Sequence, residues 1–221
     1  MQTIAIVRRR RDRRRANLIL LLSLLGILAL TAAGCGDPLT FVKRLLTPGR
    51  AIDRITVHHT ASGSKSGAQS VDVTMVAGWH RQNGIGMGYK DSRACAYHYL
   101  ILRDGRVQAG RPIERPSSGT KNAQDNRATI AICLVGDFGS RRAGRGTAGM
   151  HPTEAQLAAL EKTALWAFDR YGFGSERVRG HREVAASECP GDNFNLDGLR
   201  SRLRKAQESG REGAEPPLRF E

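Results

Sequence analysis

The sequence has few aromatic residues, few cysteines and no long apolar run. Aromatic residues make up 5% of its 221 residues, and no segment alternates them with basic residues as a nucleic-acid groove requires. The longest apolar stretch, residues 18–30, has about 13 residues, fewer than the roughly 20 of a membrane-spanning helix. No Ser-His-Asp triad in a nucleophile elbow and no HExxH helix motif is recognisable, which excludes those two classes of hydrolase.

The positive charge is concentrated near the N-terminus. The formal net charge is +14, and the seven arginines and one aspartate of residues 8–15 contribute +6, which leaves +8 for the rest of the chain. Because the remaining charge is scattered, we expect no nucleic-acid partner. The excess of positive charge fits a protein that works beside polyanions such as cell-wall polymers or anionic lipid.

Residues 1–35 have the pattern of a secretory signal. A basic segment precedes the apolar stretch, and small residues follow it and end in TAAGC at residues 31–35. This ending resembles the bacterial lipoprotein signal, in which the cysteine, here Cys35, is lipidated and becomes the first mature residue. A plain signal peptide and an uncleaved N-terminal anchor remain alternatives. We expect an exported protein of the cell envelope or periplasm, anchored to the membrane through Cys35, with residues 36–50 as a tether.

Strand and helix patterns alternate in residues 51–205 and predict one α/β domain with a mixed central sheet flanked by helices. Apolar or β-branched runs favour two strands, and Asp104-Gly105 lies in the turn of a predicted hairpin. The clearest helix has Thr153 as its expected N-cap. Residues 117–127 are predicted to form a polar loop and residues 206–221 a disordered polar tail. The predicted strands are 51–60 and 128–138, the hairpin is 94–112, and the helices are 71–84, 152–173 and 195–206.

The segment VRGHREVAASECPG (178–191) contains a candidate pair of metal ligands, His181 and Cys189. A catalytic zinc takes three protein ligands, typically imidazole nitrogen or thiolate sulfur, and keeps a fourth position for water. The segment TVHHT offers His58 or His59 as the third ligand, at the end of a predicted strand. Strand alternation places these two side chains on opposite faces, so only one can bind, and spacing alone leaves the choice open.

Six blocks of the sequence, within residues 52 to about 195, form a recognisable series: ITVHHTAS, WHRQNG, AYHYLILRDGRVQAGRP, ATIAICLVGDF, PTEAQLAALEKTALWAFDRYG and GHREVAASECPG. In order and spacing they resemble the type 2 N-acetylmuramoyl-L-alanine amidases. This family includes phage amidase lysozymes and the catalytic peptidoglycan-recognition proteins. The resemblance implies a zinc cleft on one face of the fold, with Zn²⁺ bound by His58, His181 and Cys189 and with Tyr97 as the active-site tyrosine.

Two positions depart from the family pattern. Ser187 stands where the family often has lysine or threonine; it is either a second, weaker donor beside Tyr97 or a residue that only fills the loop. Cys133 stands where some members carry a glutamate general base. We expect Cys133 and Cys95 to be small buried hydrophobes, with a disulfide between them as an alternative. Tyr97 is expected on the same strand face as Tyr99, two residues later.

The remaining histidines are expected to be structural or, for His151, exposed at the surface. The resemblance implies zinc-dependent hydrolysis of the amide between the N-acetylmuramoyl group and L-alanine, by a monomer that acts on peptidoglycan or muropeptides. A non-catalytic peptidoglycan-binding module on the same fold is the alternative. Such modules typically lose the metal-binding cysteine, and Cys189 is present, which favours the enzyme.

Overall fold

The computed structural model describes residues 50–62, 71–86, 88–140 and 150–217. The expected signal segment, Cys35 and nearly all of the expected tether therefore lie outside the described residues. Within the described ranges, every helix is too short or too polar to cross a membrane. All of these residues belong to the compact unit Pro48–Glu221.

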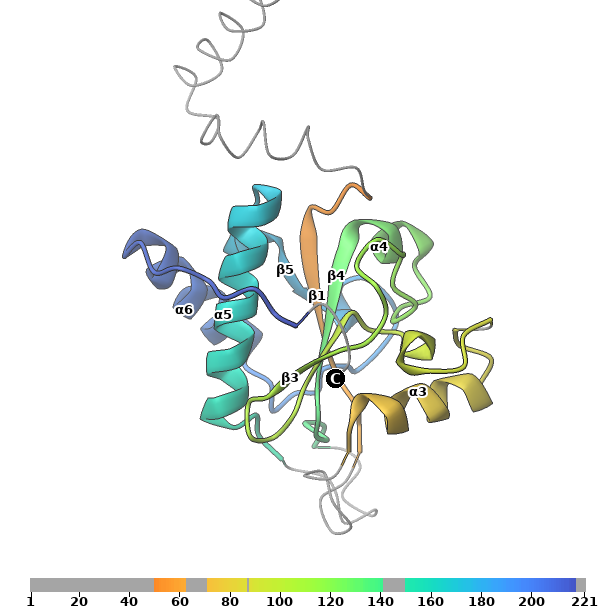
Figure 1. Ribbon diagram of the computed structural model, residues 1–221. Helices are drawn as coiled ribbons and strands as arrows, with labels where there is room; N and C mark the ends of the chain where they lie inside the picture. The colour runs from red at the N-terminus through yellow and green to blue at the C-terminus, as the bar shows by residue number, and fades with distance from the viewer. Residues whose placement is uncertain (1–49, 63–70, 87, 141–149, 218–221) are drawn as a thin grey trace, which may run out of the picture. The chain divides into compact units, whose positions relative to one another are not determined.

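A mixed five-stranded sheet lies at the centre of this unit (Figure 1). Its strand order is β3-β2-β4-β1-β5. The pairs β2–β4, β4–β1 and β1–β5 are parallel, and only the hairpin pair β2–β3 is antiparallel. The predicted mixed sheet is therefore confirmed. The strands are β1 (Arg54–His59), β2 (Tyr99–Ile101), β3 (Val107–Ala109), β4 (Thr129–Leu134) and β5 (Val178–Gly180).

Helices cover both faces of the sheet, as predicted. Helices α5 and α6 lie against one face, and α3 lies against the other (Figure 1). The α-helices are α3 (Val73–Gln82), α4 (Ala123–Ala128), α5 (Glu154–Tyr171) and α6 (Leu196–Glu208). Short 3-10 turns are η1 (Ser92–Ala94), η3 (Ser175–Arg177) and η4 (His181–Glu183).

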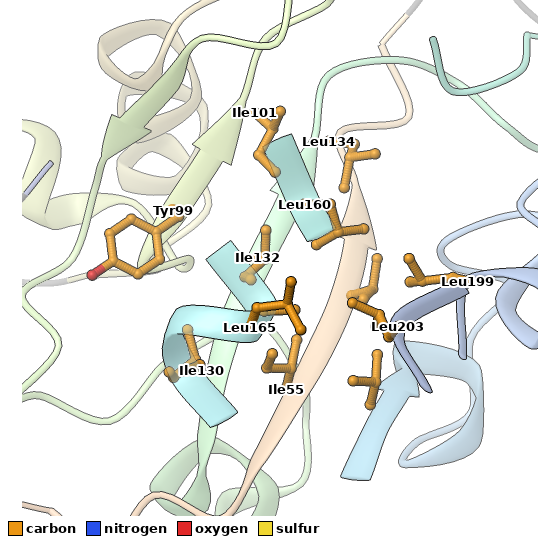
Figure 2. Close-up of a cluster of buried hydrophobic side chains, with 14 of the residues drawn as sticks. Ile55, Tyr99, Ile101, Ile130, Ile132, Leu134, Leu160, Leu165, Leu199 and Leu203 are labelled. Atoms are coloured by element: carbon orange, nitrogen blue, oxygen red, sulfur yellow. The ribbon is translucent and has the colours of Figure 1, made fainter. Parts of the chain in front are cut away.

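The larger core fills the space between the sheet and helices α5 and α6 (Figure 2). Alternate residues of β4 point into it, and the residues between them point to the α3 side, so all six residues of β4 are buried. This confirms the interpretation of its continuous apolar sequence as a strand covered on both faces. The large side chains of this core include Ile55, Ile130, Ile132, Leu134, Leu160, Leu165, Leu199 and Leu203.

Helix α5 begins at the predicted N-cap. The Thr153 hydroxyl accepts a hydrogen bond from the backbone N–H of Gln156, and the Gln156 side chain accepts one from the Thr153 N–H, which completes a capping box. The amide of Gln156 also donates to the carbonyls of Ile101 and Val135, just at the ends of β2 and β4. The cap therefore also fixes the helix against the carboxyl ends of two parallel strands.

The predicted polar loop at residues 117–127 is wrong in its second half, which forms α4. The side chain of Asn122 caps this helix by accepting from the N–H groups of Gln124 and Asp125. The helix has no apolar periodicity because its buried residue is Asp125, whose carboxylate accepts from the Thr56 hydroxyl in β1. A pattern search for an apolar face cannot detect such a helix.

The predicted disordered tail at residues 206–221 is wrong for its first part. Helix α6 continues to Glu208, and the following residues lie along α5, where the N–H of Ala214 donates to a backbone carbonyl of that helix. Arg211 also pairs with the buried carboxylate of Glu161 on α5. In this first part of the tail, the polar sequence therefore includes a charged residue that pairs with α5.

Candidate metal centre

The side chains of His58, His181 and Cys189 converge at the carboxyl end of β1. One ligand atom from each lies within 4.8 Å of the others. Nδ1 of His58 is 3.7 Å from Sγ of Cys189. Tetrahedral zinc with ordinary bonds to nitrogen and sulfur would separate two such atoms by about 3.6 Å. The donor set and its spacing therefore fit a zinc ion.

The two adjacent histidines take different positions, as strand alternation predicts. His58 is 1% exposed and lies opposite Cys133 in the parallel register of β1 and β4. Nδ1 of His59 instead accepts a hydrogen bond from the backbone N–H of Phe138 at 3.1 Å. The backbone N–H of His59 donates to Sγ of Cys189 at 3.3 Å. Of the two histidines, His58 therefore lies with His181 and Cys189 as the third candidate ligand, and the backbone of His59 supports the thiol.

A short loop after β5 brings His181 and Cys189 together. Pairing of β5 with β1 places the imidazole of His181 beside that of His58, with ring centroids 4.9 Å apart. The loop is closed by the N–H of Arg182, which donates to the carbonyl of Cys189 at 2.8 Å. Gly191 then turns the chain with φ +97°, and a Cβ there would lie 2.3 Å from backbone atoms of Phe138. The turn after Cys189 therefore requires glycine.

Burial sets the protonation of the three side chains. It lowers the pKa of His58 well below the usual value, and the neighbouring His181 lowers it further. Burial also lowers the pKa of His181, and it raises the pKa of the Cys189 thiol to about 12 against the opposing hydrogen bond from the His59 N–H. Neutral imidazoles bind metal directly, whereas a metal ion bound here would displace the thiol proton.

Tyr97 and Ser187 line the cleft beside this centre, which has a volume of about 370 Å³. The Tyr97 ring lies 4.9 Å from the His58 ring, measured between centroids. Burial raises the pKa of Tyr97 well above its usual value, so the phenol keeps its proton. The Ser187 hydroxyl accepts from the N–H of Cys189 at 3.1 Å and retains its own proton for donation. Both predicted residues therefore line the same cleft as the candidate ligands His181 and Cys189.

Tyr97 and Tyr99 lie on opposite faces of the sheet, so the prediction of a shared face is wrong. Strand β2 begins only at Tyr99, and residues 95–98 form a bend. Strand alternation therefore does not extend back to Tyr97. Tyr99 belongs to the core beneath α5, whereas Tyr97 packs on the α3 side with Cys95 and Cys133.

The two cysteines on the α3 side and His98 are structural, as predicted. Cys95 and Cys133 are fully buried free thiols, without the alternative disulfide. Nδ1 of His98 accepts from the backbone N–H of Ala131 at 2.9 Å, and burial lowers the pKa of His98 to about 3. His98 is therefore a neutral hydrogen-bonding residue of the sheet.

Two further residues contact the candidate site or its loop but were not predicted from the sequence as site residues. A Cβ at Gly119 would lie 3.0 Å from the His58 ring and 3.2 Å from the Tyr97 ring, so glycine lets this loop approach both. The side-chain amide of Asn122 donates to the carbonyl of Val184 at 3.0 Å, in the loop between the two predicted ligands. Glycine and asparagine in a polar segment are typical of any turn, so the sequence carried no specific signal.

We expect the substitution Asn122→Asp to weaken zinc binding about tenfold, at the low end of what loss of an outer-shell partner costs. Aspartate caps α4 as well as asparagine does, but it lacks the N–H group that holds Val184, so the loop with His181 and Cys189 loses one of its hydrogen bonds. Competition with a fluorescent chelator measures the affinity. Gln124→Glu makes the same charge change on an exposed side chain of α4 and serves as the control. Equal affinities for the two variants would contradict the role of this bond.

Comparison with known proteins identifies the family of the chain. Residues 48–192 match the family of N-acetylmuramoyl-L-alanine amidases. The endolysin of Escherichia phage T7 is 32% identical over 145 residues, which cover 65% of this chain and 82% of the endolysin. Peptidoglycan-recognition protein SD of Drosophila melanogaster is 28% identical over 153 residues, which cover 66% of this chain and 74% of that protein.

A solved structure supports the fold. The N-acetylmuramoyl-L-alanine amidase LysC from Clostridium intestinale URNW superposes with a TM-score of 0.56 at 21% identity, over 70% of this chain and 87% of LysC. This likeness concerns the fold alone, while the family match extends over more than half of the 221 residues. The chain therefore belongs to the N-acetylmuramoyl-L-alanine amidase family, as the resemblance of the six sequence blocks indicated.

Proposed function

We propose that the protein is a zinc-dependent N-acetylmuramoyl-L-alanine amidase. It hydrolyses the amide bond between the lactyl group of N-acetylmuramic acid and L-alanine, in peptidoglycan or in muropeptides. The observation that carries the proposal is the convergence of His58, His181 and Cys189 beside a cleft, in a chain of this family. Zn²⁺ would be held by these three side chains, and two neutral imidazoles with one thiolate leave the site at net +1.

Hydrolysis of an unactivated amide needs a polarised carbonyl, activated water and a donor for the charge that develops on the carbonyl oxygen. When bound, zinc supplies the first two, as a Lewis acid that lowers the pKa of water to about 7. The chain supplies the donor. Tyr97 keeps its phenolic proton and borders the cleft, so it donates to the oxyanion, with the Ser187 hydroxyl as a weaker second donor.

Binding of peptidoglycan without hydrolysis is the second candidate function. The similarity to peptidoglycan-recognition protein SD favours it. Retention of Cys189 next to both histidines argues for the enzyme, because a binding groove alone has no need of a thiol placed 3.7 Å from an imidazole nitrogen.

Digestion of purified sacculi distinguishes the two functions. With zinc present, the amidase releases stem peptides with a free N-terminal alanine and leaves peptide-free glycan strands, both detectable by mass spectrometry. A chelator stops the release, and added Zn²⁺ restores it. Co-sedimentation with sacculi without any released peptide would instead establish the binding module and refute the amidase.

We further propose that the protein is exported and anchored to the membrane through lipidated Cys35. The proposal rests on the basic, apolar and small-residue pattern of residues 1–35. A cysteine that carries three acyl chains holds a protein stably at a bilayer, which a single chain does not.

Substitution of the anchor residue tests this proposal. We expect Cys35→Ala to shift the protein from the membrane fraction to the soluble fraction and to change its mobility on a gel. Cys95→Ala removes a buried thiol elsewhere and should leave both properties unchanged. If the Cys35→Ala protein stays at the membrane with unaltered mobility, the apolar segment itself is the anchor.

A further inference from the structure

His80, on α3, contacts the ring of the predicted catalytic tyrosine, Tyr97. Its Nδ1 accepts a hydrogen bond from the backbone N–H of Ala96 at 3.0 Å. Its ring meets the Tyr97 ring edge-on, with centroids 5.3 Å apart and an interplanar angle of 68°. A single side chain therefore contacts both the backbone before Tyr97 and the ring of Tyr97.

The dipeptide Ala96-Tyr97 depends on contacts of this kind, since it lies in the bend before β2 and outside the strand ladder. The carbonyl of Ala96 accepts from the N–H of Ser118, and the carbonyl of Tyr97 accepts from that of Arg111. Ala96 is 1% exposed, so its N–H needs an acceptor within the protein. His80 is that acceptor.

The protonation of His80 suits this role. Burial, and to a smaller extent the positive charge of Arg111, lowers the pKa of His80 to about 4. The imidazole is therefore neutral at neutral pH. Because Nδ1 accepts a hydrogen bond, the proton of the neutral ring is on Nε2.

We infer that His80 is a positioning residue for Tyr97, which it holds in the orientation that faces the reacting amide. The inference rests on the proposed function, because it takes Tyr97 as the donor to the oxyanion. Among the described residues that line the cleft, Tyr97 is present and His80 is not. The effect of His80 on turnover therefore passes through Tyr97, whose ring it contacts and which itself lines the cleft.

Two substitutions separate the hydrogen bond from the bulk of the side chain. His80→Leu fills similar space without an acceptor, whereas His80→Asn places its side-chain oxygen near the position of Nδ1. A small misplacement of a catalytic group lowers the reaction rate by up to about a hundredfold. We therefore expect His80→Leu to lower kcat roughly tenfold. KM and zinc content should stay within about twofold, and His80→Asn should recover most of the lost turnover.

A double substitution tests whether the effect passes through Tyr97. In a Tyr97→Phe background, His80→Leu should cause little further loss, because the hydroxyl that it misplaces is already absent. The inference is overturned if His80→Leu leaves kcat unchanged, if it raises KM or removes zinc, or if its loss is the same in both backgrounds.

Amide hydrogen exchange, followed by NMR, gives a readout that does not depend on activity. The N–H of Ala96 should exchange faster in His80→Leu than in His80→Asn or in the unsubstituted protein. Equal exchange in all three would also overturn the inference. If the unsubstituted protein does not hydrolyse sacculi while the exchange differs as expected, the proposed function fails although His80 does hold Ala96, so the two failures are distinguishable.

Discussion

Replacement of Cys189 by serine should remove nearly all hydrolysis of peptidoglycan and most of the bound zinc. A hydroxyl is a poor ligand for zinc compared with a thiolate, and its introduction leaves only the imidazoles of His58 and His181. Serine is close in size and can still accept from the N–H of His59, so the loop should keep its fold. Zinc content by elemental analysis and peptide release from sacculi measure the two effects.

A second buried thiol provides the control for this substitution. Cys95→Ala should keep both zinc and activity, because Cys95 lies outside the converging set. A Cys189→Ser protein that is free of metal and fully active would refute the assignment of the ligands.

Removal of the hydroxyl by Tyr97→Phe should lower kcat by about a hundredfold, which is what the loss of one oxyanion donor costs. The bond to the oxyanion forms only as charge develops, so KM and zinc content should barely change. The ring contacts with His58 and His80 are kept by phenylalanine. Steady-state kinetics on soluble muropeptides and zinc analysis measure these quantities.

Tyr99→Phe is the matched control, because it removes the same group two residues later on the opposite face of the sheet. It should leave kcat unchanged. If the Tyr97→Phe protein has a turnover near that of the unsubstituted protein, Tyr97 is only a packing residue. If the variant loses zinc, Tyr97 is a structural support of the metal centre.

Periodicity and capping sufficed to predict the elements that pack through apolar side chains. The continuous apolar run of β4 and the Thr153 cap of α5 have the structures that their patterns indicate. Helix α4 was not predicted because its buried side chain is a carboxylate. A polar segment without apolar periodicity has the sequence pattern of a loop. Tertiary hydrogen bonding, which no local pattern records, stabilises this helix.

The candidate site was predictable as a set of residues but not as a geometry. Spacing could not choose between His58 and His59, and the fold does so by directing one toward Cys189 and the other toward Phe138. The face occupied by Tyr97 was mispredicted because β2 begins two residues later than the alternation assumed. Gly119 was missed because its importance is a close approach to His58 across the fold.

The place of β1 between β4 and β5 has a consequence for how the protein is made. The first strand to leave the ribosome acquires its two sheet neighbours only after most of the domain has been synthesised. Cys189 follows His58 by 131 residues. Any product terminated before His181 carries a single side chain of the set, and contacts so distant in sequence are slow to form. The set of side chains proposed to bind zinc is therefore complete only after residue 189 has been synthesised, and a shorter product lacks the proposed centre.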